Sequence, residues 1–84
     1  MKMSELKPGD KGLVLKVENT GEAARRLMDL GLHKGAAFKV VRRAPMGDPM
    51  EIKIRGSLLA LRMKEAEFVV VEKETVPVTE KKNG

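Results

Sequence analysis

The apolar residues of this chain fall in short runs that are separated by turns rich in glycine and proline. The strictest run covers residues 50–55, where Met50, Ile52 and Ile54 alternate with charged residues. Alternation with a period of two is typical of a β-strand that buries one face. Shorter runs of this kind predict four further strands, at residues 12–18, 38–43, 58–61 and 68–72.

One segment follows a helical period instead. Within residues 22–30 the apolar residues recur every three or four positions, Leu27 and Leu30 among them, which predicts a short amphipathic helix. Thr20 is expected to cap the start of this helix. Gly31 is expected to close its end, because glycine adopts the left-handed conformation that often terminates helices.

The first predicted strand carries apolar residues on both faces. Leu13, Leu15 and Val17 occupy alternate positions, and we expect them to point into the core. Val14 lies on the opposite face, which indicates that this face is partly covered as well.

Five strands of this length cannot form an open sheet without exposing edges. The predicted fold is therefore mainly β: a small SH3-like five-stranded β-barrel, with one short α-helix plugging one end. An open α+β sheet with the helix on one face is the alternative. A single helical turn is expected at residues 63–67. We assign residues 1–72 to this domain and residues 73–84 to a flexible, charged C-terminal tail, because no apolar period continues there.

The residue types that catalysis and metal binding require are scarce. The sequence has no Cys and one His, His33, which lies in a predicted turn. Without Cys there is no disulfide, no thiolate metal site and no cysteine nucleophile. A non-haem ferrous site typically takes two His and a carboxylate, which one His cannot supply. We therefore predict a protein that is not an enzyme, with no catalytic residues, no metal ligands, no cofactor and no small-molecule substrate.

The sequence carries no recognisable membrane or export signal. The longest apolar runs are residues 58–61 and 68–71, whereas a bilayer span takes about 20 apolar residues. The first ten residues include charges of both signs and lack the apolar segment of a signal peptide. A cytoplasmic location is expected.

Several motifs are spread along the predicted domain. The most specific is Arg-Leu-Met-Asp-Leu-Gly-Leu-His-Lys-Gly at residues 26–35. Others are Leu-Lys-Pro-Gly-Asp-Lys-Gly at 6–12, Pro-Met-Gly-Asp-Pro at 45–49 and Leu-Ala-Leu-Arg at 59–62. Together, over residues 4–72, they resemble the FeoA family, the small cytoplasmic partner in bacterial ferrous-iron transport.

This resemblance implies an SH3-like barrel that contacts FeoB, a membrane permease with a cytoplasmic GTPase domain. It further implies that the chain modulates Fe(II) uptake by protein–protein contact. The permease would then hold the chain at the inner face of the membrane.

A domain that catalyses no reaction is expected to act through the surface with which it contacts a partner. The expected contact surface is the helix with its exit, residues 25–35, joined by the loop at residues 45–49. A helix that plugs a barrel can leave an apolar cleft beside it. The residues expected to bind the partner are Arg25, Arg26, Leu30, Leu32 and Met46. For the two leucines, a place in the core is the alternative.

Charge suggests a function of a different class. The sequence has 17 Lys and Arg against 12 Asp and Glu, a net charge of +5. The alternative function is therefore a basic nucleic-acid-binding small β-barrel, which would use Lys39, Arg42, Arg43, Lys53 and Arg55 on adjacent strands. Single-strand binders add aromatic stacking platforms, and this sequence has no Tyr or Trp and two Phe, so nucleic acid is the less favoured partner. A homo-oligomer that forms through exposed barrel edges or swapped strands is a third hypothesis.

Overall fold

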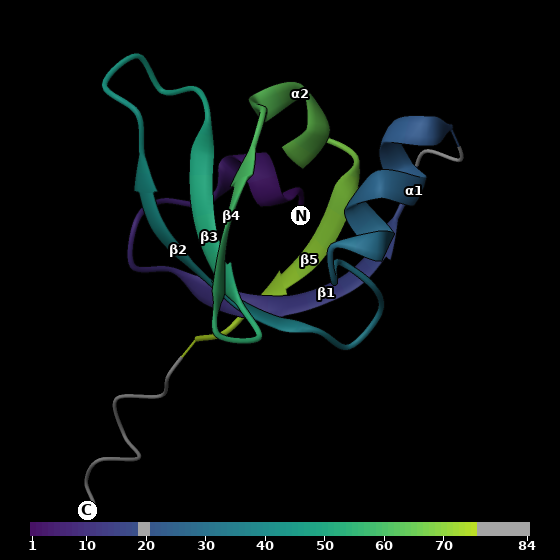
Figure 1. Ribbon diagram of the computed structural model, residues 1–84. Coiled ribbons are helices and arrows are strands. Elements are labelled where there is room, and N and C mark those ends of the chain that lie inside the picture. Colours follow the sequence, from purple (N-terminus) through teal and green to yellow (C-terminus); the bar gives the residue numbers. More distant parts are fainter. Residues whose placement is uncertain (19–20, 76–84) are drawn as a thin grey trace, which may run out of the picture.

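The computed structural model describes residues 1–18 and 21–75, and five strands form one antiparallel sheet in it (Figure 1). The strands are β1 (Lys11–Val17), β2 (Ala37–Arg43), β3 (Met50–Ile54), β4 (Ser57–Leu61) and β5 (Val69–Lys73). The helices are α1 (Glu22–Asp29), the single turn α2 (Met63–Ala66) and a 3-10 turn, η1 (Met3–Glu5). The predicted order of strands and helices is confirmed.

The strands follow the order β4-β3-β2-β1-β5 and curl around one core, as in the expected mainly β, SH3-like fold (Figure 1). The hydrogen-bonded ladder has two ends, because β4 and β5 are not neighbours in it. At the C-terminal side, Lys73 still belongs to β5 and lies opposite Gly12, one residue beyond the expected domain boundary. Most of the predicted tail, residues 76–84, lies outside the described residues.

The core consists of the inner faces of the sheet together with one side of α1 and η1. β3 follows the predicted alternation, since Met50, Ile52 and Ile54 are buried and Lys53 is exposed. From outside the sheet, Met3, Leu6, Leu27 and Leu32 complete this core.

The inward face of β1 is the opposite of the one predicted. Val14 is fully buried, whereas Leu13 and Leu15 are both more than 40% exposed. A bulge between Val14 and Lys16 shifts the alternation by one residue, so that Val17 packs against the core again. The expectation that Leu13 and Leu15 point inward was therefore wrong, and that for Val17 was right.

The face of β1 is set by a close approach at Gly12. A Cβ atom at this position would lie 2.3 Å from the backbone oxygen of Glu72 and 3.2 Å from Cζ of Phe38. Gly12 pairs with Phe38 on one side and with Lys73 on the other, so β1 passes between two strands at this point. Glycine inside a strand commonly marks such an approach.

The C-terminus of α1 ends in a Schellman motif. Gly31 has a φ of 111°, as expected for the residue that closes the helix. Its N–H donates to the oxygen of Met28, and the N–H of Leu32 donates to the oxygen of Leu27, both at 3.0 Å. This geometry turns the chain back, so that Leu32 is buried with Leu27 in the core. At the other end the N-cap residue is Gly21, and the predicted cap Thr20 lies outside the described residues.

Gly12→Ala is expected to destabilise the fold by about 3 kcal/mol, because a backbone oxygen stands where the new methyl group would be and cannot move aside cheaply. Urea unfolding followed by circular dichroism measures the loss. Lys11→Ala is the control: its side chain is exposed, so the unfolding free energy should change by less than about 0.5 kcal/mol. Equal stability of Gly12→Ala and the native chain would contradict the close approach.

Leu27→Ala is expected to cost about 2–5 kcal/mol, because it removes a fully buried side chain and leaves a cavity. Leu30→Ala makes the same chemical change three residues later on a half-exposed side chain, and its cost should stay below about 1 kcal/mol. Thermal unfolding of both variants tests the difference, and similar losses would show that α1 packs by another face.

Candidate docking surface

The structure separates the residues that were expected to share one surface. Met46 is 91% exposed in the loop between β2 and β3, and this loop and α1 lie on opposite sides of the barrel (Figure 1). Leu32 is 0% exposed, so its predicted place at the rim was wrong and the alternative, a core position, is correct. The sequence carried a signal for this: a residue that follows a C-terminal glycine often packs back on its helix.

Arg25 and Arg26 lie on α1, Leu30 follows directly after it, and all three are exposed. Arg26 forms an ion pair with Glu65 of α2, which ties the two helices together. Glu65 also accepts a hydrogen bond of 3.0 Å from the backbone N–H of Arg62, at the start of α2. Glu65 was missed as a positioning residue, although a Glu three residues after a helix start is typical of a capping box.

The surroundings of Glu65 determine its pKa. Burial raises the pKa of this carboxyl, but the hydrogen bond from the Arg62 backbone and the Arg26 guanidinium outweigh burial, so the pKa lies below its usual value. The charged form of Glu65 is thus the form that the folded protein stabilises.

Two further observations show what lies beside α2 and beside the exit of α1. Asp48, in the β2–β3 loop, accepts a hydrogen bond of 3.1 Å from the backbone N–H of Met63 at the first residue of α2. On the other side, a Cβ atom at Gly31 would lie 3.8 Å from Cδ of Arg55. The exit of α1 therefore borders the turn between β3 and β4.

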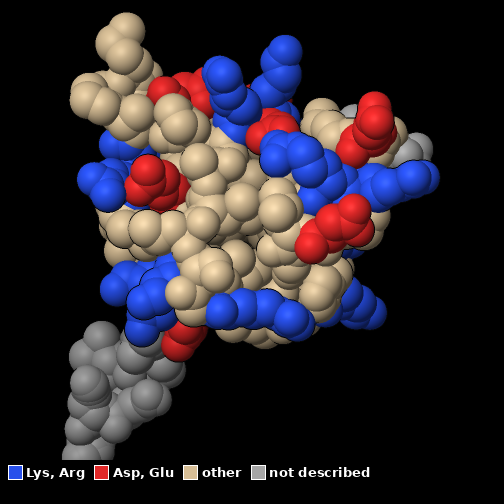
Figure 2. Space-filling model, viewed as in Figure 1, with Lys and Arg blue, Asp and Glu red and all other residues tan. Residues whose placement is uncertain are grey.

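Between β4 and α1 the molecule presents a continuous uncharged face, with basic and acidic side chains around its margin (Figure 2). The two elements that flank this face carry exposed apolar side chains. Leu58 of β4 is 60% exposed, while Met28 of α1 and Leu30 after it are both 43% exposed. An uncharged face that is flanked by exposed apolar side chains and has a charged margin is typical of a protein–protein contact surface.

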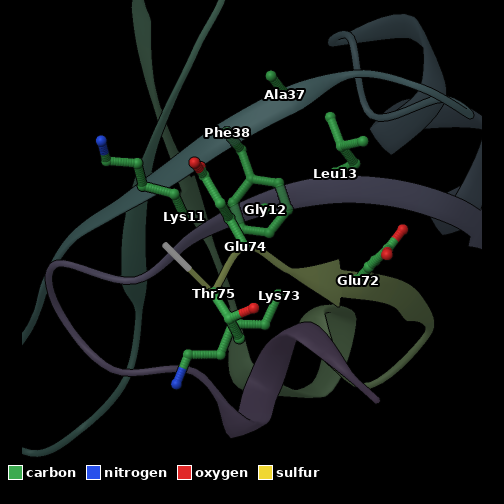
Figure 3. A pocket seen from close by; sticks show the side chains of 9 residues that line it. All are labelled: Lys11, Gly12, Leu13, Ala37, Phe38, Glu72, Lys73, Glu74 and Thr75. Carbon is green, nitrogen blue, oxygen red and sulfur yellow. The ribbon is translucent and has the colours of Figure 1, made fainter. Parts of the chain in front are cut away.

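A separate pocket of about 420 Å³ lies where β1, β2 and β5 meet. In Figure 3 the ring of Phe38 lies over Gly12, with Lys11, Lys73 and Glu74 around it. Lys73 lies 3.6 Å from the carboxylate of Asp10, whose pKa is lowered mainly by a hydrogen bond from the Lys7 backbone. This pocket is lined by charges of both signs and none of the predicted site residues.

Four of the five basic residues of the nucleic-acid alternative lie on adjacent strands, since β2 pairs with β3, whereas Arg55 lies in the turn after β3. Two of them are engaged within the protein. Arg42 forms an ion pair of 2.7 Å with Glu51, and Arg43 donates hydrogen bonds to the backbone oxygens of Ser4 and Leu6. Arg43 thereby fastens the N-terminal segment to the sheet.

The described residues offer little to a metal ion. Among residues 1–18 and 21–75, no three His, Asp or Glu side chains are grouped so that they could hold one. His33 is exposed in its turn, as predicted. Over the same residues, no helix has the length and apolar character needed to cross a bilayer.

The sequence model of the FeoA domain family matches residues 1–73 of this chain. The chain belongs to the FeoA family. Among solved structures, the FeoA protein of Chlorobium tepidum is 49% identical, with a TM-score of 0.83 over 89% of this chain and 71% of that one. Stenotrophomonas maltophilia FeoA, solved in complex with zinc and described as an SH3 domain protein, is 33% identical, with a TM-score of 0.78 over 88% of this chain and 95% of that one.

A relative from Porphyromonas gingivalis joins this domain to a transporter. It is a fusion of Fe(2+) transport protein A with the Fe(2+) transporter FeoB, and it is 33% identical over 72 residues. The match covers 86% of this FeoA chain and 8% of the fusion protein. FeoA and FeoB are thus parts of one polypeptide in that organism, which links this family to ferrous iron transport and associates it with FeoB.

The tie between α1 and α2 predicts a stability that depends on pH. The pKa of Glu65 is lower in the folded protein than in the unfolded chain. Its carboxylate therefore stabilises the fold at pH values above its pKa in the unfolded chain, and this stabilisation is lost as pH falls through its pKa in the folded protein. Arg26→Ala should therefore lower the unfolding free energy by about 0.5–1 kcal/mol at neutral pH. At about pH 3 or below, where carboxyls become protonated, this loss should largely vanish.

Arg25→Ala is the matched control for Arg26→Ala, because Arg25 is the neighbouring residue and forms no ion pair among the described residues. Its unfolding free energy should equal that of the native chain at both pH values. Urea unfolding at neutral and acidic pH measures these differences. An equal effect of the two substitutions at neutral pH would show that the tie contributes nothing.

Proposed function

We propose that this FeoA protein is an accessory protein of ferrous iron transport that docks on a FeoB-like permease and modulates Fe(II) uptake by contact, without catalysing a reaction. The observation that carries this proposal is the fusion of the same domain to FeoB in one polypeptide. Fusion keeps two domains at a high effective concentration, which favours partners that act on one another by contact.

The structure supports a role as a contact module. The described residues expose an uncharged face between β4 and α1, but gather no set of metal ligands. In this proposal iron is the cargo of the permease, and the FeoA chain acts on the cytoplasmic side of the permease. The proposed location is the cytoplasm, at the inner face of the membrane.

Retention of the cytoplasmic part of the permease on immobilised FeoA chain tests the proposal. We expect retention in at least one of three states: nucleotide-free, GTP-bound or GDP-bound. Beads without the chain are the control for adsorption. No retention in any state, together with no association with the full-length permease in membranes, would overturn docking.

A further inference from the structure

The sheet has two end strands, and their free edges differ. The free edge of β5 is covered by the N-terminal segment: the N–H of Val71 donates to the oxygen of Met1 at 2.8 Å, and Lys2 bridges to Val70. Within the described residues, β4 has no such cover, since its backbone pairs with β3 and with nothing else. One edge of the sheet is therefore closed and the other is open.

The hairpin turn between β3 and β4 decides which backbone groups face the open edge. Arg55 and Gly56 both have positive φ, as in a two-residue hairpin turn, and Ile54 lies opposite Ser57. In such a hairpin the closing pair exchanges both hydrogen bonds, and the pattern then alternates along the strand. The N–H and C=O groups of Leu58 and Ala60 consequently point away from β3.

This edge lacks the usual protection against pairing. Natural edge strands carry charges, proline or bulges that block another strand. β4 reads Ser-Leu-Leu-Ala-Leu, with a regular register to β3 and with Leu58 exposed. The open edge also borders the uncharged face that extends toward α1 (Figure 2).

The charged residues nearest to β4 in the sequence that form no ion pair among the described residues are all basic. Exposed cations lie on both sides of the strand in the sequence: Lys53 and Arg55 before it, and Arg62 and Lys64 after it, none of them in an ion pair among residues 1–18 and 21–75. The acids nearest in sequence, Glu51 and Glu65, are paired with Arg42 and Arg26. A strand that binds here is favoured if it carries carboxylates at its ends.

The same charges disfavour a second copy of this chain. In a symmetric antiparallel pairing of two β4 strands about Leu59, each Arg62 falls opposite Gly56 of the other copy and beside its Arg55. The cationic end of each strand is thereby brought beside the cationic start of the other copy, and juxtaposed like charges oppose association. Charge complementarity therefore selects an acidic partner.

We propose that the open edge of β4 binds an extended segment from the cytoplasmic part of the permease, which adds a sixth strand to the sheet. The segment would carry apolar side chains at alternate positions and Asp or Glu at its ends. Backbone hydrogen bonds to Leu58 and Ala60 supply affinity, the uncharged face receives apolar side chains, and Arg55 and Arg62 bind the carboxylates. That the segment comes from the permease rests on the proposed function, whereas strand addition at the open edge of β4 does not.

Ala60→Pro tests the edge directly. Proline removes the N–H of Ala60, which points away from β3, so the β3–β4 ladder keeps its hydrogen bonds while an added strand loses one and meets the ring. Ala60→Val is the matched control, because it keeps the N–H. Calorimetric titration with the permease's cytoplasmic part should give dissociation constants for Ala60→Val and the native chain within about twofold, and at least about tenfold weaker binding for Ala60→Pro. Equal binding by Ala60→Pro would overturn the edge proposal and leave docking intact.

A second measurement needs neither the permease nor the variant. A synthetic peptide with a Val-Thr-Val-Thr-Val centre and two Glu at each end is titrated into the native chain, and amide signals are followed by NMR. We expect the amides of Leu58 and Ala60 to shift and to become protected from hydrogen exchange, and a peptide with Lys at its ends to bind at least about tenfold more weakly. If the permease part does not bind the native chain, the proposed function fails and this titration alone decides the edge.

The remaining outcomes of these experiments also decide the proposal. Unshifted Leu58 and Ala60 amides, or equal binding of the Lys-ended peptide, would overturn it. Sedimentation that shows a dimer of the native chain and a monomer of Ala60→Pro would assign the edge to a second copy, against the acidic partner. Should Ala60→Pro fail to fold, the peptide titration on the native chain is the test.

Discussion

The close approach at Gly12 is the constraint on which the rest of this fold depends. β1 lies between β2 and β5. A Cβ atom at Gly12 would collide with the backbone of Glu72 and crowd the ring of Phe38. The sheet can therefore curl tightly at β1, which brings the inner faces of all five strands onto one small core. With Gly12 and Val14 turned inward, Leu13 and Leu15 are left on the outside.

The sheet curls around a single core without closing, and its two end strands differ in whether their free edges are covered. Five short strands bend far enough to enclose the core, yet β4 and β5 do not join. The N-terminal segment, fastened by Arg43, covers the edge of β5, while the ion pair between Arg26 and Glu65 links the helices. The remaining edge, β4, borders the uncharged face, so the candidate docking surface lies where the two ends of the sheet do not join.

Local patterns were sufficient to predict the elements of this fold, because each depends on neighbours in sequence. The alternation in β3 and the glycine that ends α1 are examples, and both were predicted correctly. The face of β1 could not be predicted, since the close approach at Gly12 and the bulge after Val14 depend on strands far away in the sequence. The candidate surface was predicted in part: Arg26 and Leu30 border it, whereas Leu32 is buried and Met46 lies across the barrel.

The charge distribution explains how a basic chain can favour a protein over a nucleic acid. A basic groove binds single strands well when aromatic rings stack on the bases. Here Phe38 is buried in the core and Phe68 is half-buried, and these are the two aromatic residues of the sequence. Arg42 and Arg43 are held by Glu51 and by backbone oxygens. Among the described residues, Lys39 and Lys53 on these two strands, and Arg55 and Arg62 at the two ends of β4, form no ion pair. Cations at the two ends of an open strand can bind carboxylates at the two ends of an extended peptide, so the arrangement around β4 favours an acidic protein segment.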